Sequence, residues 1–355
     1  MPNQPDSVAA ALHLLQDLIR LPSFSRSEDK TADLLADFLA GQSIPVHRKG
    51  NNVWAFHPQQ DPSKPYLLLN SHHDTVHPNA SYTLDPFLPD IKNDKLYGLG
   101  SNDAGGCLVS LLFAFLHFYE KGNLAYNLVF VASAEEEISG QHGIEMVLPE
   151  LPPIACGLVG EPTLLQMAVA ERGLMVLDVV ASGRTGHAAR NEGDNALYKA
   201  VEDICWMQNH AFDRVSDLLG PVKLTVTSFQ TQNRQHNVVP EQAEFVVDVR
   251  VNELYSFEEI LHIIQANINS AARPRSMRLQ PSKIALDHPL VTAGLALGKT
   301  CYGSPTTSDM ALMPFPTLKM GPGDSARSHM ADEFIYTAEI ADGIETYIAI
   351  LNQVL

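Results

Sequence analysis

The sequence predicts an α/β protein with a central, mostly parallel sheet and a second, smaller α+β domain inserted into it. Apolar runs of strand length alternate with helical patterns up to residue 171, as is typical of a parallel sheet that is covered on both faces. Between residues 172 and 278 the strands alternate in polarity, and from residue 279 the first pattern returns. A chain of 355 residues with 45% hydrophobic content is long enough to bury two such cores.

The larger domain is expected to comprise residues 1–171 and 279–355. Apolar residues recur at helical spacing in four segments of this domain, at 8–20, 31–40, 104–121 and 339–351. Short apolar runs predict four strands, at 53–56, 66–70, 127–134 and 154–159. Ligands of such sheets gather beyond the carboxyl ends of the strands, so polar residues that follow these runs are candidate site residues.

The inserted domain is expected to span residues 172–278. Strands of alternating polarity are predicted at 174–180, 223–229 and 243–251, and amphipathic helices at 196–207 and 257–268. A strand–helix–strand–strand–helix order within roughly one hundred residues favours a compact α+β sandwich. The edges of the insertion would act as hinges between the two domains.

The composition argues against several classes of partner. A formal net charge of −17 disfavours nucleic acid and anionic membranes. No uninterrupted apolar stretch approaches the roughly 18 residues of a membrane-spanning helix, and the N-terminus lacks the pattern of a secretion signal. The four cysteines are dispersed in apolar surroundings, so we expect buried free thiols and a cytoplasmic location.

Acidic and histidine residues are concentrated in five short segments, at 71–76, 100–103, 135–137, 160–163 and 328–329. Together these segments offer imidazoles and several carboxylates, which is a ligand mix that suits zinc. A site with oxygen and nitrogen ligands and no thiolate usually keeps one coordination position open for water, as catalytic zinc sites do. The five segments together predict a metal-dependent hydrolase, although each of them has a simpler explanation by itself.

Two of these segments directly follow predicted strands. His72 and Asp74 are two residues apart and would share one face, with the imidazole as ligand and the carboxylate behind it. His73 would face the opposite way, and it stays open as an alternative ligand to His72. In Glu135–Glu137, neighbours on an extended segment would face opposite ways, so that one can bind metal while the next reaches substrate or water. The simpler explanation of this triplet is a solvated helix start.

The other three segments are turns. Asp103 lies in a Gly-rich turn before a helix, where a carboxylate can bridge two cations or simply cap the helix. Glu161 ends a strand and precedes a proline, and the alternative for it is an ordinary turn. His329 follows a loop rich in Gly and Ser, where a histidine can also bond only to the backbone.

The order of these segments along the chain and the residues within them resemble those of the dinuclear-zinc amidohydrolases and metallopeptidases. That family includes acetylornithine deacetylase, succinyl-diaminopimelate desuccinylase, aminoacylase and a bacterial glutamate carboxypeptidase. The resemblance covers nearly the whole chain and implies two zinc ions, with cobalt or manganese as alternatives. The roles that it implies are His72 and Glu161 as ligands of one ion, Asp103 as the bridge, Glu137 and His329 as ligands of the other ion, Asp74 as the residue that orients His72, and Glu136 as the general base.

The inserted domain resembles the lid and dimerisation domain of the same family. The sequence Gly-Arg-Thr-Gly-His-Ala-Ala looks like the segment whose histidine, here His187, crosses a dimer interface and assists the partner's site, so the resemblance implies a homodimer. The Asn-Val-Val-Pro and Asp-Val-Arg motifs resemble elements that contact the substrate through Asn237 and Arg250. Without the resemblance, His187 would be interpreted as a turn histidine and Arg250 as an exposed strand arginine.

The chain departs from the family pattern at three places. Ser71 stands where a Gly usually precedes the first metal histidine, Ala104-Gly105 where many members carry Met-Lys, and Leu99 where an Arg is often found. These departures leave the metal ligands untouched, but the lost cations remove the basis for copying a substrate from the better-known members. Ser308-Asp309 and Gly321-Pro322-Gly323 match the family's late substrate-side loops.

The resemblance implies hydrolysis of the amide bond in an N-acyl amino acid. Glu136 would take a proton from a zinc-activated water and return it to the leaving amine, His187 would stabilise the oxyanion, and Arg250 would grip the α-carboxylate. Within the family, the short chain favours an acetylornithine-deacetylase-like enzyme of arginine biosynthesis that acts on N-acetyl or N-succinyl ornithine or citrulline. The alternatives are a di- or tripeptidase or carboxypeptidase of the same family, and a non-catalytic metal- or peptide-binding protein.

Overall fold

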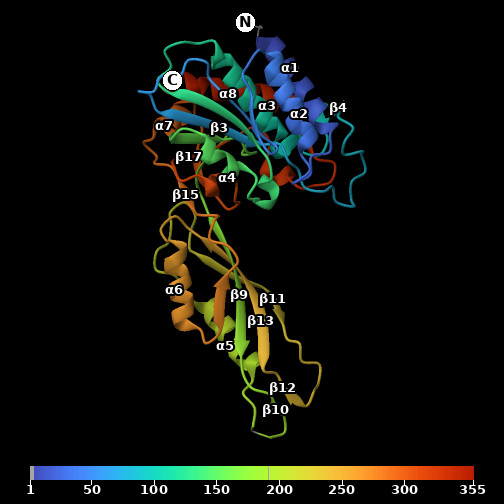
Figure 1. Ribbon diagram of the computed structural model, residues 1–355, viewed down its shortest axis with the longest axis vertical. Helices are drawn as coiled ribbons and strands as arrows, with labels where there is room; N and C mark the ends of the chain where they lie inside the picture. Colours follow the sequence, from blue (N-terminus) through green and yellow to red (C-terminus); the bar gives the residue numbers. More distant parts are fainter. Residues whose placement is uncertain (1–3, 191) are drawn as a thin grey trace. The chain divides into compact units, whose positions relative to one another are not determined.

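The computed structural model describes residues 4–190 and 192–355, and it divides into two compact units (Figure 1). The first unit comprises the chain up to Val169 together with Lys283–Tyr302 and Ser308–Leu355. The second comprises Ala170–Ser282 and Gly303–Thr307. The sequence placed the insertion at nearly the same positions, at 172–278.

The short segment Gly303–Thr307 was expected in the first domain but packs within the second unit. Its glycine lies so close to the backbone of Leu218 that an added Cβ would be 2.3 Å from that carbonyl oxygen. At its other end, the guanidinium of Arg250 donates a hydrogen bond of 3.4 Å to the Thr307 hydroxyl. These contacts join residues that are far apart in the sequence, so they cannot be predicted from a local pattern.

A nine-stranded sheet forms the centre of the first unit. Its order is β1-β2-β6-β3-β7-β17-β8-β15, and β16 pairs with β8. The bounds of its strands are β1 His47–Lys49, β2 Asn52–Phe56, β3 Tyr66–His72, β6 Asn127–Ser133, β7 Ile154–Val159, β8 Met167–Glu171, β15 Ser282–Lys283, β16 Cys301–Ser304 and β17 Thr317–Lys319. The central strands β6, β3, β7 and β17 run parallel, whereas β2 and β8 join them antiparallel. The predicted central, mostly parallel sheet is therefore confirmed.

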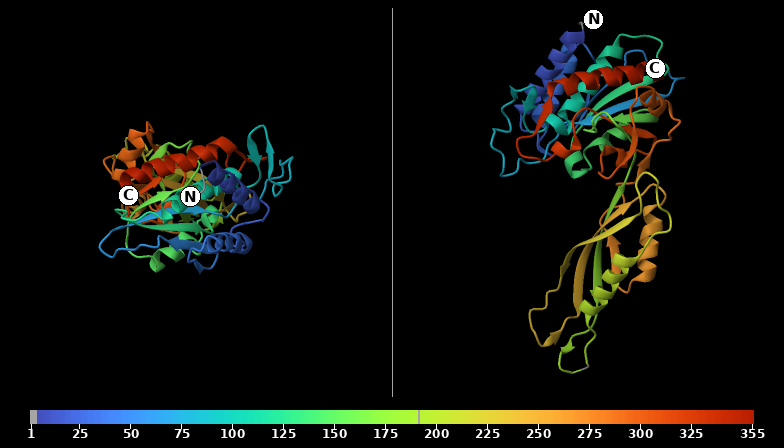
Figure 2. Two further views of the ribbon diagram at one scale, coloured as in Figure 1. Left: turned by 90° about the horizontal axis from the view of Figure 1, so that it is seen from above. Right: turned by 180° about the vertical axis from the view of Figure 1, so that it is seen from behind.

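Helices cover both faces of this sheet (Figure 2). On one face, α3 is apolar on nearly every side and is buried against β3, β6, α1 and α8. On the other face, α4 packs over side chains of β2, β3 and β6, such as Trp54 and Val129. The bounds of the helices are α1 Gln4–Ile19, α2 Asp29–Gly41, α3 Gly106–Tyr119, α4 Ile144–Val147, α7 Pro289–Ala296 and α8 Thr337–Val354.

A small antiparallel sheet of order β18-β5-β4 lies in the same unit, with bounds β4 Asp90–Lys92, β5 Lys95–Tyr97 and β18 Phe334–Tyr336. Phe334 pairs with Tyr97, the last residue of β5. The loop that precedes β18 is therefore held beside the turn that follows β5. These two connections carry His329 and Asp103 respectively.

The second unit is a four-stranded antiparallel sheet of order β11-β13-β9-β14, packed against α5 and α6. Every second side chain of β9 and β13 is buried under the helices, as the alternating polarity predicted. A two-stranded ribbon of β10 and β12 continues from the end of the β9–β13 pair. The bounds are β9 Gly173–Ser182, β10 Gly186–His187, α5 Ala196–Asn209, β11 Lys223–Gln230, β12 Val238–Val239, β13 Gln242–Val251, α6 Phe257–Asn267 and β14 Ala271–Pro274.

The expectation of four buried thiols is wrong for two of them. Cys107 and Cys156 are buried, but Cys205 is exposed and Cys301 is half-buried; all four are free. Cys205 faces outward because it lies on the side of α5 opposite the buried Ala200, Asp203 and Met207. Within the described residues, the helices are all too short or too polar to cross a membrane.

Candidate metal centre

The structure brings the five predicted ligands of the first unit together. His72 ends β3, Glu137 follows β6 and Glu161 follows β7, so three of them lie at the carboxyl ends of neighbouring strands. Asp103 and His329 come from the turn before α3 and the loop before β18. His72 Nε2 lies 3.3 Å from Asp103 Oδ1 and 3.8 Å from Glu161 Oε1.

The carboxylate of Asp103 lies between two histidines. Its Oδ1 is the oxygen near His72, whereas its Oδ2 lies 3.8 Å from His329 Nε2. Each histidine has a glutamate of its own, because Glu161 is near His72 and His329 Nε2 lies 2.9 Å from Glu137 Oε2. Ligand atoms of one tetrahedral zinc, each bonded at about 2.1 Å, lie about 3.4 Å apart.

Two sets of three residues each bring their ligand atoms within 4.8 Å of one another. One set is His72, Asp103 and Glu137, and the other is His72, Glu136 and Glu161. These oxygen and nitrogen donors and their spacings fit divalent metal ions. His72 belongs to both sets, and the two oxygens of Asp103 face His72 and His329.

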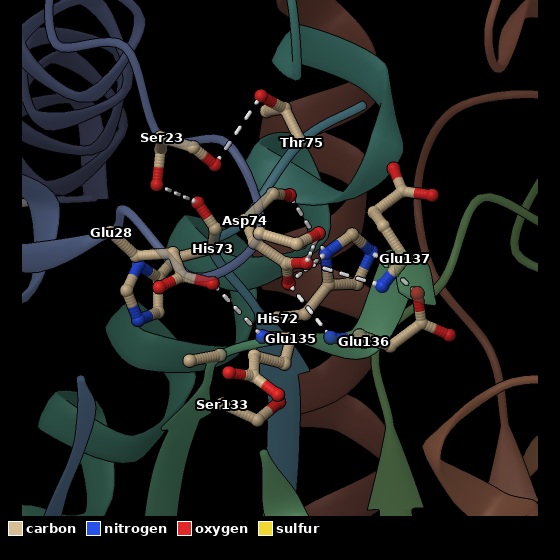
Figure 3. A network of polar contacts seen from close by, with 12 residues as sticks. Ser23, Glu28, His72, His73, Asp74, Thr75, Ser133, Glu135, Glu136 and Glu137 are labelled. Atoms are coloured by element: carbon tan, nitrogen blue, oxygen red, sulfur yellow. Dashed lines mark hydrogen bonds and ion pairs between the residues drawn. The ribbon is translucent and has the colours of Figure 1, made fainter. Parts of the chain in front are cut away.

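His72 and His73 point to opposite sides of the chain (Figure 3). Nδ1 of His73 lies 2.9 Å from the Thr31 hydroxyl, and its Nε2 lies 2.9 Å from the backbone oxygen of Asn51. Burial lowers the pKa of His73 to about 4. Both nitrogens of His73 are engaged away from the carboxylates, which leaves His72 as the histidine that faces them.

The sequence predicts that Asp74 orients His72, and in the structure Asp74 also holds the turn of Glu136 and Glu137. Nδ1 of His72 lies 3.0 Å from the backbone oxygen of Asp74 and 3.4 Å from its carboxylate. The same carboxylate accepts hydrogen bonds from the Ser25 hydroxyl at 2.6 Å and from the backbone N–H groups of Glu136 and Glu137 at 3.0 and 3.2 Å (Figure 3). Asp74 therefore anchors both the first histidine and the turn that carries the predicted base.

The acidic triplet is not extended, contrary to the expectation from sequence. The strand ends at Ser133, Glu135 has a left-handed φ of 53°, and Glu136–Ile138 forms a short helical turn. The carboxylate of Glu135 turns away and accepts a hydrogen bond of 3.3 Å from the backbone of His142. Glu136 and Glu137 both stay near the cluster because Asp74 holds their two N–H groups from one side.

Burial and mutual repulsion dominate the electrostatics of the cluster. Burial raises the pKa of Glu136 well above its usual value and that of Glu161 to about 8. The hydrogen bond with Glu137 raises the pKa of His329 to about 9. Burial opposes protonation of His72, but the charge of Glu136 and the hydrogen bond with Asp103 outweigh it and raise the pKa of His72. Several carboxylates buried together are costly, and cations between them would offset that cost.

Two buried acids near the cluster were not predicted as site residues. Glu333 accepts hydrogen bonds from the turn that carries Asp103, and burial raises its pKa to about 8. Asp309 accepts hydrogen bonds from Asn70 at 2.8 Å and Ser133 at 2.7 Å, and burial raises its pKa to about 6. The match of Ser308-Asp309 to a family loop pointed at Asp309, whereas no motif or spacing in the sequence around Glu333 pointed to it.

The candidate residues of the second unit fall at two separate places. His187 and Asn237 are exposed on the β10–β12 ribbon, where the N–H of Ala188 donates to the Asn237 carbonyl. Arg250 lies near the far end of β13, with its guanidinium held by Asp248 at 2.8 and 3.1 Å. Gln242, at the ribbon end of β13, lies eight residues before Arg250, which at about 3.3 Å per residue places the two roughly 26 Å apart.

The three departures from the family pattern are accommodated by packing within the first unit. The hydroxyl of Ser71 donates a hydrogen bond of 2.8 Å to the carbonyl of Gly160, which joins the ends of β3 and β7. Leu99 is buried. A Cβ at Gly105 would lie 2.5 Å from the Gly100 carbonyl oxygen, so the backbone approach there requires glycine.

Comparison with known proteins places these observations in a family. Residues 68–353, most of the chain, match Peptidase family M20/M25/M40. Succinyl-diaminopimelate desuccinylase from Erythrobacter litoralis is 26% identical over 273 residues, which cover 70% of this chain and 71% of that enzyme. The enzyme of the same name from Rhodospirillum centenum is 27% identical over 304 residues, covering 79% and 77%.

Solved structures share the fold over nearly the whole chain. Aminopeptidase PepT from Bacillus cereus has a TM-score of 0.77 at 18% identity and 99% coverage of both chains. A dinuclear metal-binding peptidase from Bacillus subtilis has a TM-score of 0.71 at 16% identity and 98% coverage of both. The desuccinylase relatives do not support the preference for an acetylornithine-deacetylase-like enzyme of arginine biosynthesis. The predicted family and the hydrolase class are confirmed: this chain belongs to Peptidase family M20/M25/M40 and is a metal-dependent hydrolase of amide bonds.

Proposed function

We propose that this protein uses two divalent metal ions, with zinc as the first candidate, to remove the acyl group from an N-acyl amino acid. The observation that carries the proposal is the placement of Asp103, whose two oxygens face two different histidines. His72 with Glu161 would hold one ion, and His329 with Glu137 the other. Each ion would then have two ligands of its own and share the aspartate.

Glu136 favours an enzyme over a non-catalytic metal-binding protein. Its Oε2 lies 3.8 Å from His72 Nε2, yet the proposed ligand set is complete without it. Burial raises its pKa, which brings a carboxylate toward the range in which it can accept and return a proton near neutral pH. A protein that only bound metal would gain nothing from this additional buried acid.

The ions and the residues around them would have separate roles in the reaction. The ions, when bound, would polarise the acyl carbonyl and make water acidic enough to lose a proton near neutral pH. Glu136 would take that proton and return it to the leaving amine, while Asp74 holds the turn in place through the N–H of Glu136. Arg250 would bind the α-carboxylate through the guanidinium edge that Asp248 leaves open, and Asn237, which lies on the same ribbon as His187, would contact the substrate of a second copy of the chain.

The desuccinylase relatives make a succinylated amino acid the first substrate to test. A panel would contain N-succinyl-diaminopimelate, the N-succinyl and N-acetyl forms of ornithine and citrulline, and simple dipeptides. Release of succinate, acetate or free amine is measured with zinc, cobalt or manganese. Turnover of an N-acyl amino acid supports the proposal, turnover of dipeptides alone would replace it with a peptidase, and metal binding without any turnover would favour a binding protein.

We also propose that the active form is a homodimer. The ribbon that carries His187 and the strand end that carries Arg250 lie roughly 26 Å apart within one second unit, too far for one small substrate to touch both. A second copy could supply the histidine. Tyr198 and Val201 on α5 and Phe229 on the edge strand β11 are exposed apolar side chains that such a copy would cover.

Mixed dimers test this arrangement directly. Glu136→Gln and His187→Ala chains, each inactive alone, are mixed and allowed to exchange. If His187 acts on the partner's site, one site in each mixed dimer regains both residues, so about one quarter of the wild-type activity should return. If the mixture stays inactive although mass measurements show mixed dimers, His187 serves its own chain or has no role.

A further inference from the structure

We propose that Glu333 is a positioning residue for the shared carboxylate. It fixes the turn that carries Asp103 and ties that turn to the loop that carries His329. The inference rests on the proposed two-metal function. It concerns how the aspartate is kept between the two histidines, and it assigns no contact with substrate to Glu333.

Glu333 is buried, with 3% of its surface exposed, and its carboxylate accepts three backbone hydrogen bonds. Oε1 accepts from the N–H groups of Asn102 at 2.8 Å and Asp103 at 2.9 Å, and Oε2 accepts from Gly100 at 2.9 Å. The backbone oxygen of Glu333 also accepts from the N–H of Gly98 at 3.0 Å. One residue thus holds four N–H groups of a six-residue stretch that ends at the proposed bridge.

The turn depends on an acceptor from outside because it is not a regular helix. Gly100 has a left-handed φ of 74°, Asp103 has non-helical dihedral angles, and the regular helix α3 begins only at Gly106. Buried N–H groups without acceptors are costly, and a carboxylate can accept several of them at once. Removing this carboxylate would therefore release the backbone at Asp103 itself.

Glu333 also connects the two sides of the cluster. It lies four residues after His329, and its neighbour Asp332 accepts hydrogen bonds from the backbone N–H groups of Thr83 and Leu84 at 2.8 and 2.9 Å. The loop of His329 is thus fastened to the segment of Thr83 and Leu84 through Asp332, and to the Asp103 turn through Glu333. This fastening keeps Asp103 Oδ2 at 3.8 Å from His329 Nε2, a spacing that one ion can fill.

The test compares Glu333→Gln with Asp203→Asn. The amide of Glu333→Gln keeps one acceptor oxygen but turns an N–H₂ group toward a backbone N–H, so the Asp103 turn must shift. Metal content after dialysis should fall below that of the wild type, and the affinity for the weaker ion should drop about ten-fold or more. kcat should fall while KM changes little, and excess zinc should restore part of the activity. Asp203→Asn, which changes another buried carboxylate that accepts two backbone N–H groups, but in the second unit, should keep the wild-type metal content.

The outcomes separate this inference from the proposed function. If wild-type protein binds two ions and hydrolyses substrate while Glu333→Gln binds them equally well, Glu333 has only a structural role and the inference is wrong. If wild-type protein itself retains fewer than two ions and shows no hydrolysis, the proposed function fails first. Should Glu333→Gln not fold, Glu333→Asp decides in its place: a folded variant with weakened metal binding supports the inference, and unchanged binding overturns it.

Discussion

The two units of this molecule present their candidate residues in opposite ways. In the first unit, five residues from five separate segments converge, and His72 Nε2 lies within 3.8 Å of three different carboxylates. In the second unit, His187 lies on the β10–β12 ribbon and Arg250 near the opposite end of β13. The first unit can therefore assemble a metal centre within itself, whereas the candidate residues of the second unit are not brought together within it.

Sheet topology explains this difference. Strands β3, β6 and β7 are parallel neighbours, so the residues that follow them meet at one edge. In the antiparallel sheet β11-β13-β9-β14, successive connections alternate between the two ends, and residues on neighbouring strands need not meet. Sequence motifs at the ends of parallel strands thus carry more information about a shared site than motifs in an antiparallel sheet.

The largest effect is expected at Glu136. Glu136→Gln removes the proposed base and leaves all five ligands, so kcat should fall by about 10³-fold while the metal content stays at the wild-type level. Glu135→Gln is the matched control, because that neighbouring carboxylate bonds to His142 and faces away from the cluster. Its turnover should stay within a few-fold of the wild type. Equal losses in both variants would show that the turn as a whole, and not Glu136, is responsible.

Much of the fold and of this cluster can be predicted from sequence because both depend on local patterns. The apolar runs that became β3, β6 and β7 are continuous, and the polar residues that follow them include His72, Glu137 and Glu161. The shape of the acidic turn could not be predicted, because it is set by Asp74, which bonds to the N–H groups of Glu136 and Glu137 from over 60 residues away. The attachment of Gly303–Thr307 to the second unit has the same kind of cause.

Glu333 shows the limit of motif reasoning most clearly. Nothing in its immediate sequence marks it, since an acidic residue before a strand is usually exposed. Its burial follows from the pairing of β18 with β5, two three-residue strands that are too short to predict from apolar runs. A residue that acts only through backbone N–H groups leaves no characteristic spacing in the sequence.

A smaller effect is expected at Arg250, and it tests whether the second unit contributes to substrate binding at all. Arg250→Lys keeps the charge but cannot form the bidentate hydrogen bonds that a guanidinium makes with a carboxylate. KM should therefore rise about ten-fold or more with little change in kcat. Arg275→Lys is the control, because Arg275 also pairs with an aspartate of the second unit, Asp178, but is exposed. If both variants keep the wild-type KM, the α-carboxylate is bound by other residues and the contrast between the two units becomes sharper.

The smallest effect concerns the division of labour between His72 and His73, and it appears in stability. Burial lowers the pKa of His73 to about 4, below the value of about 6.5 in an unfolded chain. As the pH falls from 7 to 5, the unfolded state takes up a proton at this position and the folded state does not, so stability is lost in that window. For a depression of this size the loss at pH 5 is about 2 kcal/mol.

Metal-free His73→Gln should be less stable than the wild type at pH 7, since the contacts with Thr31 and Asn51 are weakened, but it should lose about 2 kcal/mol less than the wild type between pH 7 and pH 5. Denaturant unfolding at the two pH values measures both differences. A His73→Gln variant that loses stability with falling pH as steeply as the wild type would mean that His73 is not held neutral by burial, and the argument that it is unavailable to metal would lose its main support.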